Sequence, residues 1–427
     1  MQPQTFGDVD QRSLTQLKRT APGAAFAALM ADHHPGYGMP IGGVVAWEDK
    51  VSPNGVGFDI ACGNKAVRTR LSASEIRDEL PLLMDEINER ISFGMGRVNN
   101  EPADHPVLDA IREAPFEPQR VLLDTAAKQL GTVGGGNHYV DLLEDEEVYV
   151  WVGVHFGSRG FGHKTATGFL ALAQGKTFGE HATEGGMDVG PVLLDTDTEL
   201  GQGYVEAMQL AGDYAYAGRD LVVAKILEIL GAAPTLEVHN HHNFAWREEH
   251  DGCEVWVVRK GATPAFPGQL GFVGGSMGTS SVVLEGVDSS ESAAALYSTV
   301  HGAGRVMSRA EAAGKSRKRW TCNNRDCDWV QPPRSHKPPA CPSCGGTRFS
   351  KRWVLERPGR IDWPRVRAEL AARGIELRGG GADEAPDVYK DLDAVLAAQG
   401  DTIVVRHRLE PLGVAMAGPE VKDPYKD

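Results

Sequence analysis

The chain has 427 residues, 41% of them hydrophobic and 24% charged, which is typical of a globular protein with a large buried core and about two or three domains. No apolar run approaches the roughly 18 residues of a membrane span, and the first residues lack the basic and apolar regions of a signal peptide, so we expect a cytoplasmic protein without membrane contact. The net charge of -14 excludes a nucleic-acid binder that uses its whole surface, but it leaves room for a local basic patch.

Helix and strand signals alternate along the chain and predict a mixed α/β (α+β) fold. Residues 72–75 fit a capping box in front of a helical apolar pattern, which Pro81 should kink or restart. Residues 148–156 and 254–260 are rich in valine and aromatic residues and predict strands, whereas residues 204–230 predict one long helix with a face of small residues. Polar residues end both strands, so we expect functional groups at strand ends.

Glycine residues gather in short bursts between these elements. Because each burst adjoins a polar or metal-binding residue type, we expect one site that is assembled from loops spread over the chain. The bursts are GYGMPIGG (36–43), GVGFDIACG (55–63), GTVGGGNH (131–138), GSRGFGH (157–163), GGSMG (274–278), HGAG (301–304) and RGGGADEAP (378–386).

Five residues in or next to these loops have the side chains of metal ligands. They are one carboxylate, one thiol and three imidazoles, and a thiolate can bridge two ions. A single histidine or buried cysteine is more often structural, so these residue types leave a metal centre and a structural role both open. The five residues are Asp59, Cys62, His138, His155 and His242.

His301 begins the sequence His-Gly-Ala-Gly-Arg. The three small residues after it would let backbone N–H groups approach a phosphate, and Arg305 could bind the phosphate oxygens. A neutral imidazole beside a metal-bound phosphate could act as a nucleophile. The alternative is a histidine at the start of a helix, with glycines that serve packing alone.

Residues 315–352 differ in composition from the rest of the chain. They hold ten Lys or Arg residues against two Asp residues, so this short segment is basic within an acidic chain. Four of the six cysteines fall in the same segment, in two pairs that are separated by thirteen residues. This spacing predicts a zinc ribbon, whose zinc would be structural because four thiolates leave no open position. The predicted ligands are Cys322, Cys327, Cys341 and Cys344.

We therefore predict a zinc-ribbon module over residues 315–357, inserted in a larger catalytic domain that comprises residues 1–314 and 358–427. Such a segment has few aliphatic residues and would need the metal to fold. Its basic residues are interleaved with Trp320, Trp329, Phe349 and Trp353, a pattern that suits a surface for RNA phosphates and bases. The alternative is that the aromatic residues pack the ribbon against the main domain and the charges only solvate it.

Nine stretches of the chain resemble the RtcB family of RNA ligases, in the same order and at similar spacing. The resemblance runs from about residue 30 to residue 418 and is broken mainly by the basic segment. The stretches are DHHPGYGMPIGGVVA, GVGFDIACG, GGGNHYVDL, HFGSRGFGH, HHNFA, RKGATPAF, GGSMGTSS, HGAGRVMSRAEA and DEAPDVYKDLD.

The resemblance implies an RtcB-like fold, with central β-sheets flanked by helices, and a site with two manganese ions. In that family Cys62 would bridge both ions. His155 and His242 would complete one ion's site, and Asp59 and His138 the other. The ligand types alone would accept zinc, cobalt or nickel as readily as manganese.

The same resemblance implies a GTP site. The family's nucleophile falls on His301, and Asp32 matches the carboxylate that orients it. Asn137 and Arg305 match residues that contact phosphate, and Tyr389 resembles the aromatic residue on which the base stacks. Further nucleotide contacts are implied for Asp141, Ser276, Met277, Gly278, Gly302, Ala303 and Gly304.

The implied activity is RNA ligation, in tRNA splicing or RNA repair. His301 would attack the α-phosphate of GTP and carry guanylate covalently. The guanylate would then pass to an RNA 3′-phosphate, which is formed where necessary from a 2′,3′-cyclic phosphate. Attack by a 5′-hydroxyl would seal the strand. Alternatives are an enzyme that only caps 3′-phosphates, a metal-dependent phosphoesterase, and a non-catalytic RNA-binding repair factor. The physiological RNA and the need for an activating protein partner stay open.

Four positions depart from the family pattern. Asp141 stands where a glutamate that contacts guanine is usual, and Ala417 stands where a lysine near the base is typical. Gly275 replaces a proline, and Gly218 replaces an asparagine in the long helix. Because the first two changes concern the base, we expect a relaxed or altered nucleotide preference.

Overall fold

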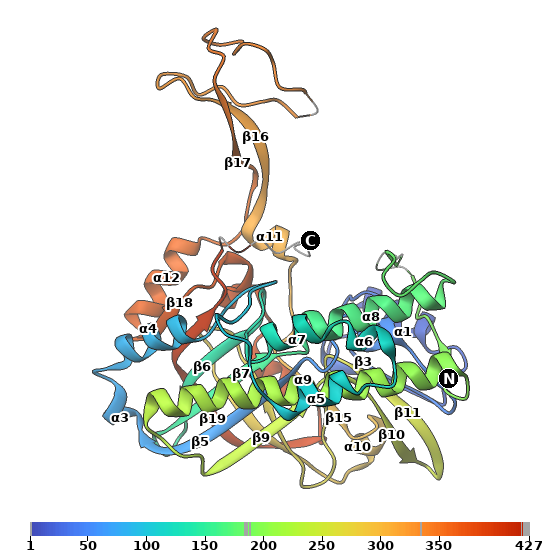
Figure 1. Cartoon of the computed structure of the whole chain (residues 1–427). Helices are drawn as coiled ribbons and strands as arrows, with labels where there is room; N and C mark the ends of the chain where they lie inside the picture. The colour runs from blue at the N-terminus through green and yellow to red at the C-terminus, as the bar shows by residue number, and fades with distance from the viewer. Residues whose placement is uncertain (1, 183–186, 188, 334, 420, 422–427) are drawn as a thin grey trace.

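The structure is a computed structural model that describes residues 2–182, 187, 189–333, 335–419 and 421. Its largest sheet, within these residues, has eight strands and runs through the middle of the molecule (Figure 1). The hydrogen-bonded order is β13 (Leu270–Val273), β14 (Ser281–Gly286), β19 (Ile403–Met416), β6 (Tyr139–Glu144), β7 (Tyr149–Phe156), β5 (Gly63–Ser72) and β9 (Leu236–His241), with β18 (Glu376–Arg378) paired to β19.

A second sheet has five described strands, in the order β1 (Gln4–Thr5), β2 (Phe26–His34), β3 (Ile41–Trp47), β11 (Cys253–Lys260) and β10 (Asn243–His250). Three short pairs complete the strands of the described chain. They are β12 (Ala262–Pro264) with β15 (Ser298–Val300), β4 (Lys50–Val51) with β8 (Leu194–Asp195), and β16 (Gly314–Cys322) with β17 (Phe349–Pro358).

Helices cover one face of the large sheet (Figure 1). The longest is α9 (Glu199–Leu230), which packs with α4 (Leu80–Arg90), α5 (Pro106–Arg112) and α8 (Arg159–Ala173). The other helices are α1 (Gln11–Thr20), α2 (Pro53–Val56), α3 (Ala73–Ile76), α6 (Glu117–Arg120), α7 (Leu123–Gln129), α10 (Ser290–Ala294), α11 (Arg309–Ala313), α12 (Trp363–Ala372), α13 (Leu392–Ala398), η1 (Ala382–Glu384) and η2 (Pro386–Val388). The mixed α/β prediction is confirmed.

Helix boundaries follow from their capping residues. The capping box of Ser72 and Glu75 forms, and the helix stops after one turn and restarts at Leu80, with Pro81 in its first turn, as predicted. The long helix begins five residues earlier than predicted, because the side chain of Thr198 accepts the backbone N–H of Gly201. It ends as expected, at a left-handed glycine.

Strand β7 is buried on both faces, which explains its continuous apolar sequence. Val150, Val152 and Val154 pack in the core under α4 and α9, whereas Trp151 packs on the other face with Phe272. The strand therefore lies in the middle of the molecule and carries its last residues into the interior.

The β16–β17 hairpin projects away from the body of the molecule, and loops that hold the four clustered cysteines form its outer end (Figure 1). We call residues 314–358 the arm. Among the described residues, no helix combines the length and the apolar character that crossing a membrane requires.

Candidate catalytic site

Strand register brings the five predicted metal-ligand residues together at one end of the large sheet. Gly63, the first residue of β5, is paired with Phe156 of β7 on one side and with His241 of β9 on the other. Residues next to these three positions therefore meet, among them Cys62 and His242. His155 is paired with Tyr139, the first residue of β6, so His138 lies beside it; Asp59 comes from the loop before β5.

The five side chains form two groups that share Cys62. Its Sγ lies 3.4 Å from Nε2 of His155 and 3.5 Å from Nε2 of His138. His242 completes the first group. Asp59 completes the second, with Oδ2 3.0 Å from Nε2 of His138. Within each group, the candidate ligand atoms lie within 4.8 Å of one another.

A buried arginine fixes the loop that carries Cys62. Arg219 of α9 is fully buried and donates to the backbone oxygens of Ala61 and Phe156, at 3.0 and 2.6 Å. Ala61 has a φ of 57°, a left-handed conformation that side chains other than glycine rarely adopt. The hydrogen bond from Arg219 thus offsets local strain directly beside Cys62.

Burial sets the protonation of the imidazoles. It lowers the pKa of His155 and of His242 well below the usual value, so both rings are neutral and have a lone pair to offer. Asn64 accepts a hydrogen bond from Nδ1 of His155 at 2.6 Å, while its amide nitrogen donates to the backbone of Phe272 at 2.8 Å. This contact directs Nε2 of His155 at Cys62.

Burial raises the pKa of Asp59, but the hydrogen bond and charge of His138 outweigh it, and the net pKa is lowered. Burial and the negative charge of Asp59 raise the pKa of Cys62 well above its usual value. A cation between these residues would therefore favour the thiolate.

His301 lies beside the first group, with its ring centroid 4.9 Å from that of His242. Asp32 of β2 is fully buried, and its Oδ2 lies 2.7 Å from Nδ1 of His301 and accepts the backbone N–H of His301 at 3.0 Å. Because Nδ1 is engaged, Nε2 is the ring nitrogen available to a reactant. Gly304 has a φ of 76°, and a Cβ there would lie 2.0 Å from the backbone oxygen of Asp32, so this approach requires glycine.

A cavity of about 280 Å³ adjoins His301 and both ligand groups. Two predicted residues do not line it: Asp32 lies behind His301, and Gly278 is packed near Leu370 of α12. The other predicted nucleotide residues all contribute to its wall, namely Asn137, Asp141, Ser276, Met277, His301, Gly302, Ala303, Gly304, Arg305 and Tyr389.

Arg305 is already bound within the protein. Its guanidinium donates to the backbone oxygen of Asp383 at 2.7 Å and to Glu384 at 3.1 Å, and it lies 5.2 Å from the centre of the Tyr389 ring. The Tyr389 hydroxyl donates to the same carboxylate of Glu384. A phosphate that binds Arg305 would therefore compete with Glu384. The hydrogen bond to Glu384 fixes the Tyr389 hydroxyl, and Tyr389 lines the cavity.

Asp141 lies on β6 and is buried in the cavity wall. Burial raises its pKa well above the usual value and so favours the neutral form of the carboxyl. Its Oδ1 has no hydrogen-bond partner within the described part of the chain. A neutral carboxyl can donate as well as accept a hydrogen bond, and a group left without a partner in the wall is suited to contact a ligand.

Several further residues form or support the site, and the sequence patterns predict no role for them. His34, Arg309 and Glu384 line the cavity, and Asn64 and Arg219 hold the ligand groups from behind. The first three lie within the quoted family stretches, so their position was a usable signal. The last two contact the site only through tertiary packing.

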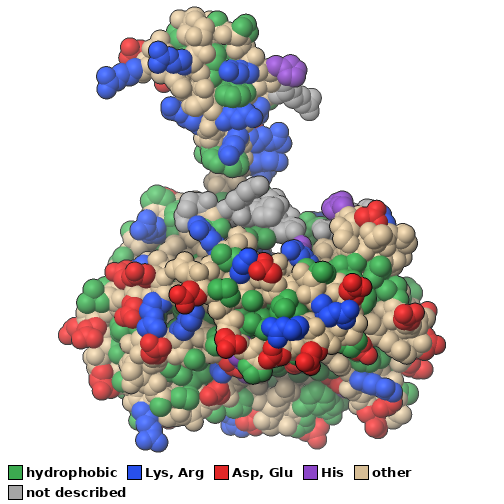
Figure 2. Space-filling model, in the orientation of Figure 1, with side chains coloured by type: hydrophobic (Ala, Val, Ile, Leu, Met, Phe, Trp, Pro, Cys, Tyr) green, Lys and Arg blue, Asp and Glu red, His purple; other side chains and the backbone are tan. Residues whose placement is uncertain are grey.

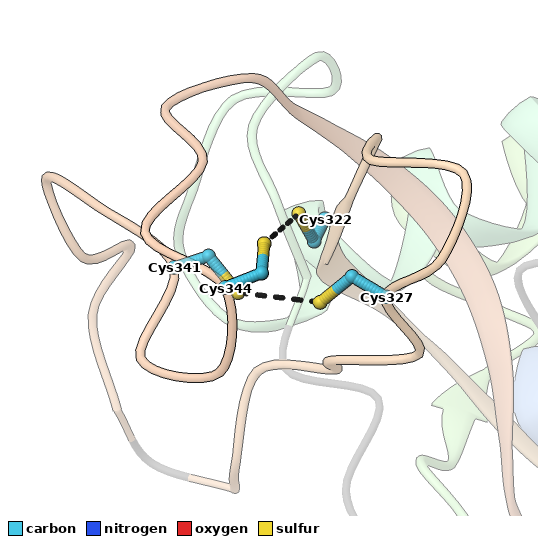
Figure 3. A group of neighbouring side chains, drawn as sticks. All are labelled: Cys322, Cys327, Cys341 and Cys344. Atoms are coloured by element: carbon cyan, nitrogen blue, oxygen red, sulfur yellow. Dashed lines mark hydrogen bonds between the residues drawn. The ribbon is translucent and has the colours of Figure 1, made fainter.

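The four clustered cysteines meet at the outer end of the arm (Figure 3). Sγ of Cys322 lies 3.6 Å from that of Cys344, and Sγ of Cys327 lies 3.6 Å from that of Cys341; no disulfide joins them. Zinc–sulfur bonds of about 2.3 Å in a tetrahedron would place the sulfurs about 3.8 Å apart, so the cluster has the dimensions of a zinc site.

Known proteins similar to this chain are RNA ligases of one family. The family model described as tRNA-splicing ligase RtcB matches residues 15–117 and 112–328. The chain is 31% identical to the RNA-splicing ligase RtcB of Escherichia coli (strain K12), over 90% of this chain and 88% of that protein. It is 30% identical to the tRNA-splicing ligase RtcB of Thermococcus kodakarensis, over 91% and 87% of the two chains. The RNA-splicing ligase RtcB of Mycobacterium tuberculosis is 31% identical, over 92% and 98%.

Proposed function

The chain belongs to the RtcB family of RNA ligases, and on this premise we propose that it joins an RNA 3′-phosphate or 2′,3′-cyclic phosphate end to a 5′-hydroxyl end through a guanylate carried on His301. The observation that supports this chemistry most directly is the contact between His301 and the buried Asp32. It leaves Nε2 free in a cavity of about 280 Å³, beside His242.

In the first step, the lone pair of Nε2 of His301 forms a bond to the α-phosphorus of GTP, the bond to the bridging oxygen breaks, and pyrophosphate leaves. The imidazole gains positive charge as this bond forms, and Asp32 stabilises that charge through Nδ1–H. An oxygen of the RNA 3′-phosphate then displaces the imidazole, which leaves guanylate on the RNA. Finally the 5′-hydroxyl attacks the 3′-phosphate and GMP departs.

We propose that the two groups hold two manganese ions, with Cys62 shared between them. The donor set supports this proposal, because two neutral imidazoles, a charged carboxylate and a shared thiol suit divalent transition metals. His155 and His242 would complete one site, and Asp59 and His138 the other. Bound ions would supply charge neutralisation and orientation for the phosphate oxygens.

The nucleotide is proposed to be GTP, with a preference that is relaxed because Asp141 is shorter than the usual glutamate. Asn137, Ser276 and Met277 would contact the nucleotide from the cavity wall, and the ring of Tyr389 would stack on the base. Gly302, Ala303 and Gly304 would approach the phosphates with their backbone, and Arg305 would exchange Glu384 for a phosphate. Gly278 would act through the shape of its loop.

We further propose that residues 315–357 are a module inserted in the catalytic domain (residues 1–314 and 358–427) and hold a structural zinc ion. The spacing of the four sulfurs supports a closed tetrahedral site. The backbone N–H of Cys341 donates to the oxygen of Gly346, and the N–H of Gly345 donates to the oxygen of Cys341. These hydrogen bonds close a turn that carries two of the four thiols.

Two measurements test the function. The purified protein, incubated with GTP and Mn²⁺, should gain the mass of one guanylate, and His301→Ala should gain none. With one RNA that ends in a 3′-phosphate and another that begins with a 5′-hydroxyl, the wild type should form a joined product. A nucleotide-bearing 3′ end without joining would replace ligation by capping, and no covalent nucleotide at all would overturn the proposal.

A further inference from the structure

The two faces of the arm differ in composition. Residues paired across an antiparallel hairpin project from the same face, and the register pairs Lys318 with Trp353 and Trp320 with Lys351. Lysine and tryptophan therefore alternate on one face, along and across the strands. Lys337, from the loop at the outer end, lies over the same face. We call these five residues the stripe.

The side chains of the stripe are in mutual contact. The Lys318 ammonium lies 5.3 Å from the centre of the Trp353 ring, and those of Lys337 and Lys351 lie 4.7 and 5.2 Å from the Trp320 ring. Such cation–π contacts hold the lysines over the rings while their charge stays exposed. Trp353 itself is 64% exposed. The stripe is thus an ordered surface that combines flat aromatic rings with positive charge.

The opposite face of the hairpin is partly neutralised. Arg317 and Arg319 are both paired with Glu356, whereas no ion pair involves the three stripe lysines among the described residues. The space-filling view shows Lys and Arg side chains clustered over the arm, above a body on which acidic and basic residues are mixed (Figure 2). The lysines of the stripe thus keep their charge, whereas Glu356 offsets part of the charge of the opposite face.

The aromatic residues of the arm do not all serve packing. Trp329 and Phe349 pack against each other within the outer loops, with ring centroids 5.6 Å apart and their planes at 70°. These two rings account for an apolar centre next to the cysteines. Trp353 has no such partner in the described chain beyond Lys318, and its exposure contradicts packing of this ring against the main domain.

The base of the arm is attached to the wall of the cavity. Helix α11, which immediately precedes β16, begins with Arg309, a cavity-lining residue that pairs with Glu384. The far strand returns to the same helix, where Arg360 donates to the backbone and the carboxylate of Glu311. A chain that leaves the cavity on this side would therefore meet the arm.

We propose that the stripe binds unpaired nucleotides of the RNA whose end occupies the cavity, with a base stacked on the exposed Trp353 and phosphates at the three lysines. This inference rests on the proposed function for the nature of the substrate. Aromatic rings that alternate with cations favour a single strand, because bases in a duplex are already stacked on each other. From residue 318 to residue 320 a strand spans about 7 Å, and Lys337 lies over the Trp320 ring at the outer end of this span.

The test compares two double variants that remove equal charge. Lys318→Gln/Lys351→Gln alters the stripe, and Arg317→Gln/Arg352→Gln alters the opposite face. Binding of a single-stranded RNA with a 3′-phosphate is measured by fluorescence anisotropy without nucleotide or metal added. We expect the stripe variant to weaken binding about tenfold and to reduce the salt slope by about 1.4, and the control to have a smaller effect.

Trp353→Ala isolates stacking and, at an exposed position, leaves the fold intact. It should weaken single-strand binding about tenfold and leave duplex binding unchanged. It should raise the KM for joining only on substrates with a single-stranded flank. Equal losses in both double variants, or no effect of Trp353→Ala, would overturn the proposal. Uptake of guanylate on His301 needs no RNA and is measured in parallel, so its absence in the wild type would count against the proposed function alone.

Discussion

Asp32 contacts His301 at two atoms at once: one carboxylate oxygen lies 2.7 Å from the ring nitrogen Nδ1 and 3.0 Å from the backbone nitrogen. The same oxygen also accepts the backbone N–H of Gly302 at 3.3 Å. The ring orientation, its tautomer and the turn that follows it are therefore set by a single buried side chain. Loss of its charge should affect the reactivity of His301 more than the shape of the cavity.

The first prediction concerns this charge. Asp32→Asn keeps an oxygen for the backbone but cannot stabilise the imidazolium, so transfer of guanylate to His301 should slow by about 100-fold or more. The rate is measured with radiolabelled GTP in a single turnover, and GTP affinity should change little. A rate within a few-fold of the wild type would show that the carboxylate has no chemical role.

The second prediction concerns Asn64, which orients His155 from behind. Asn64→Ala should weaken Mn²⁺ binding about 10- to 100-fold, because the ring is no longer held with Nε2 toward Cys62. Asn240→Ala is the matched control, since this neighbour on β9 also donates to a backbone oxygen, that of Leu270. Within the described chain, its side chain has no hydrogen bond to an imidazole ligand. Metal titration of both variants measures their Mn²⁺ affinities. Equal Mn²⁺ affinities of the two variants would argue against orientation of His155 by Asn64.

The third prediction concerns acid stability. Burial raises the pKa of Asp145, but hydrogen bonds from Trp151, Tyr149 and Arg68 outweigh burial and lower the net pKa below 3.8. The carboxylate thus stabilises the fold at pH values above 3.8, and this contribution is lost as the pH falls through the lowered pKa. Asp145→Asn should reduce the free energy of unfolding by about 1–3 kcal/mol at pH 7.

Denaturant titrations of wild type and Asp145→Asn between pH 7 and pH 3 measure this contribution. The difference between the two proteins should shrink at the acidic end of the range. A difference that stays constant with pH would mean that the lost hydrogen bonds, and not the ionised form of Asp145, account for the change.

The fourth prediction concerns the cysteine cluster. Cys344→Ser, or removal of metal by a chelator, should release zinc and unfold the outer end of the arm, which shifts the fluorescence of Trp320 and Trp329. Uptake of guanylate on His301 should persist when Mn²⁺ is supplied again. Cys253→Ser is the control, because this cysteine is exposed and lies outside all three candidate metal groups. A purified wild type without zinc would refute the site.

Much of this architecture could be predicted from local sequence. The capping box at residues 72–75, the restart at Pro81 and the strand at 148–156 depend on neighbours in the chain, and the structure contains all three. The spacing of the four cysteines likewise predicted that they cluster, because each pair of cysteines lies in one short turn of the chain.

The supporting residues could not be predicted in this way. Asn64 reaches His155 only because β5 and β7 are paired in one register, and Arg219 reaches the Cys62 loop across 158 residues of sequence. A shift by one residue would turn Asn64 to the other face of the sheet. The residue types at 62, 138, 155 and 242 left a metal centre open, and it is tertiary pairing that brings them within ligand distance.

The last prediction concerns the base. Asp141 is buried and one methylene shorter than glutamate, and its Oδ1 has no partner in the described chain. We therefore propose that it contacts a base less specifically than a longer carboxylate would. The wild type should therefore label His301 from more than one of GTP, ATP, CTP and UTP. Asp141→Glu adds one methylene, which should extend the carboxyl toward the base and shift labelling toward GTP, while Asp141→Asn, a control of equal length, should leave the pattern broad. Strict use of GTP by the wild type would show that guanine is recognised by other residues of the cavity wall.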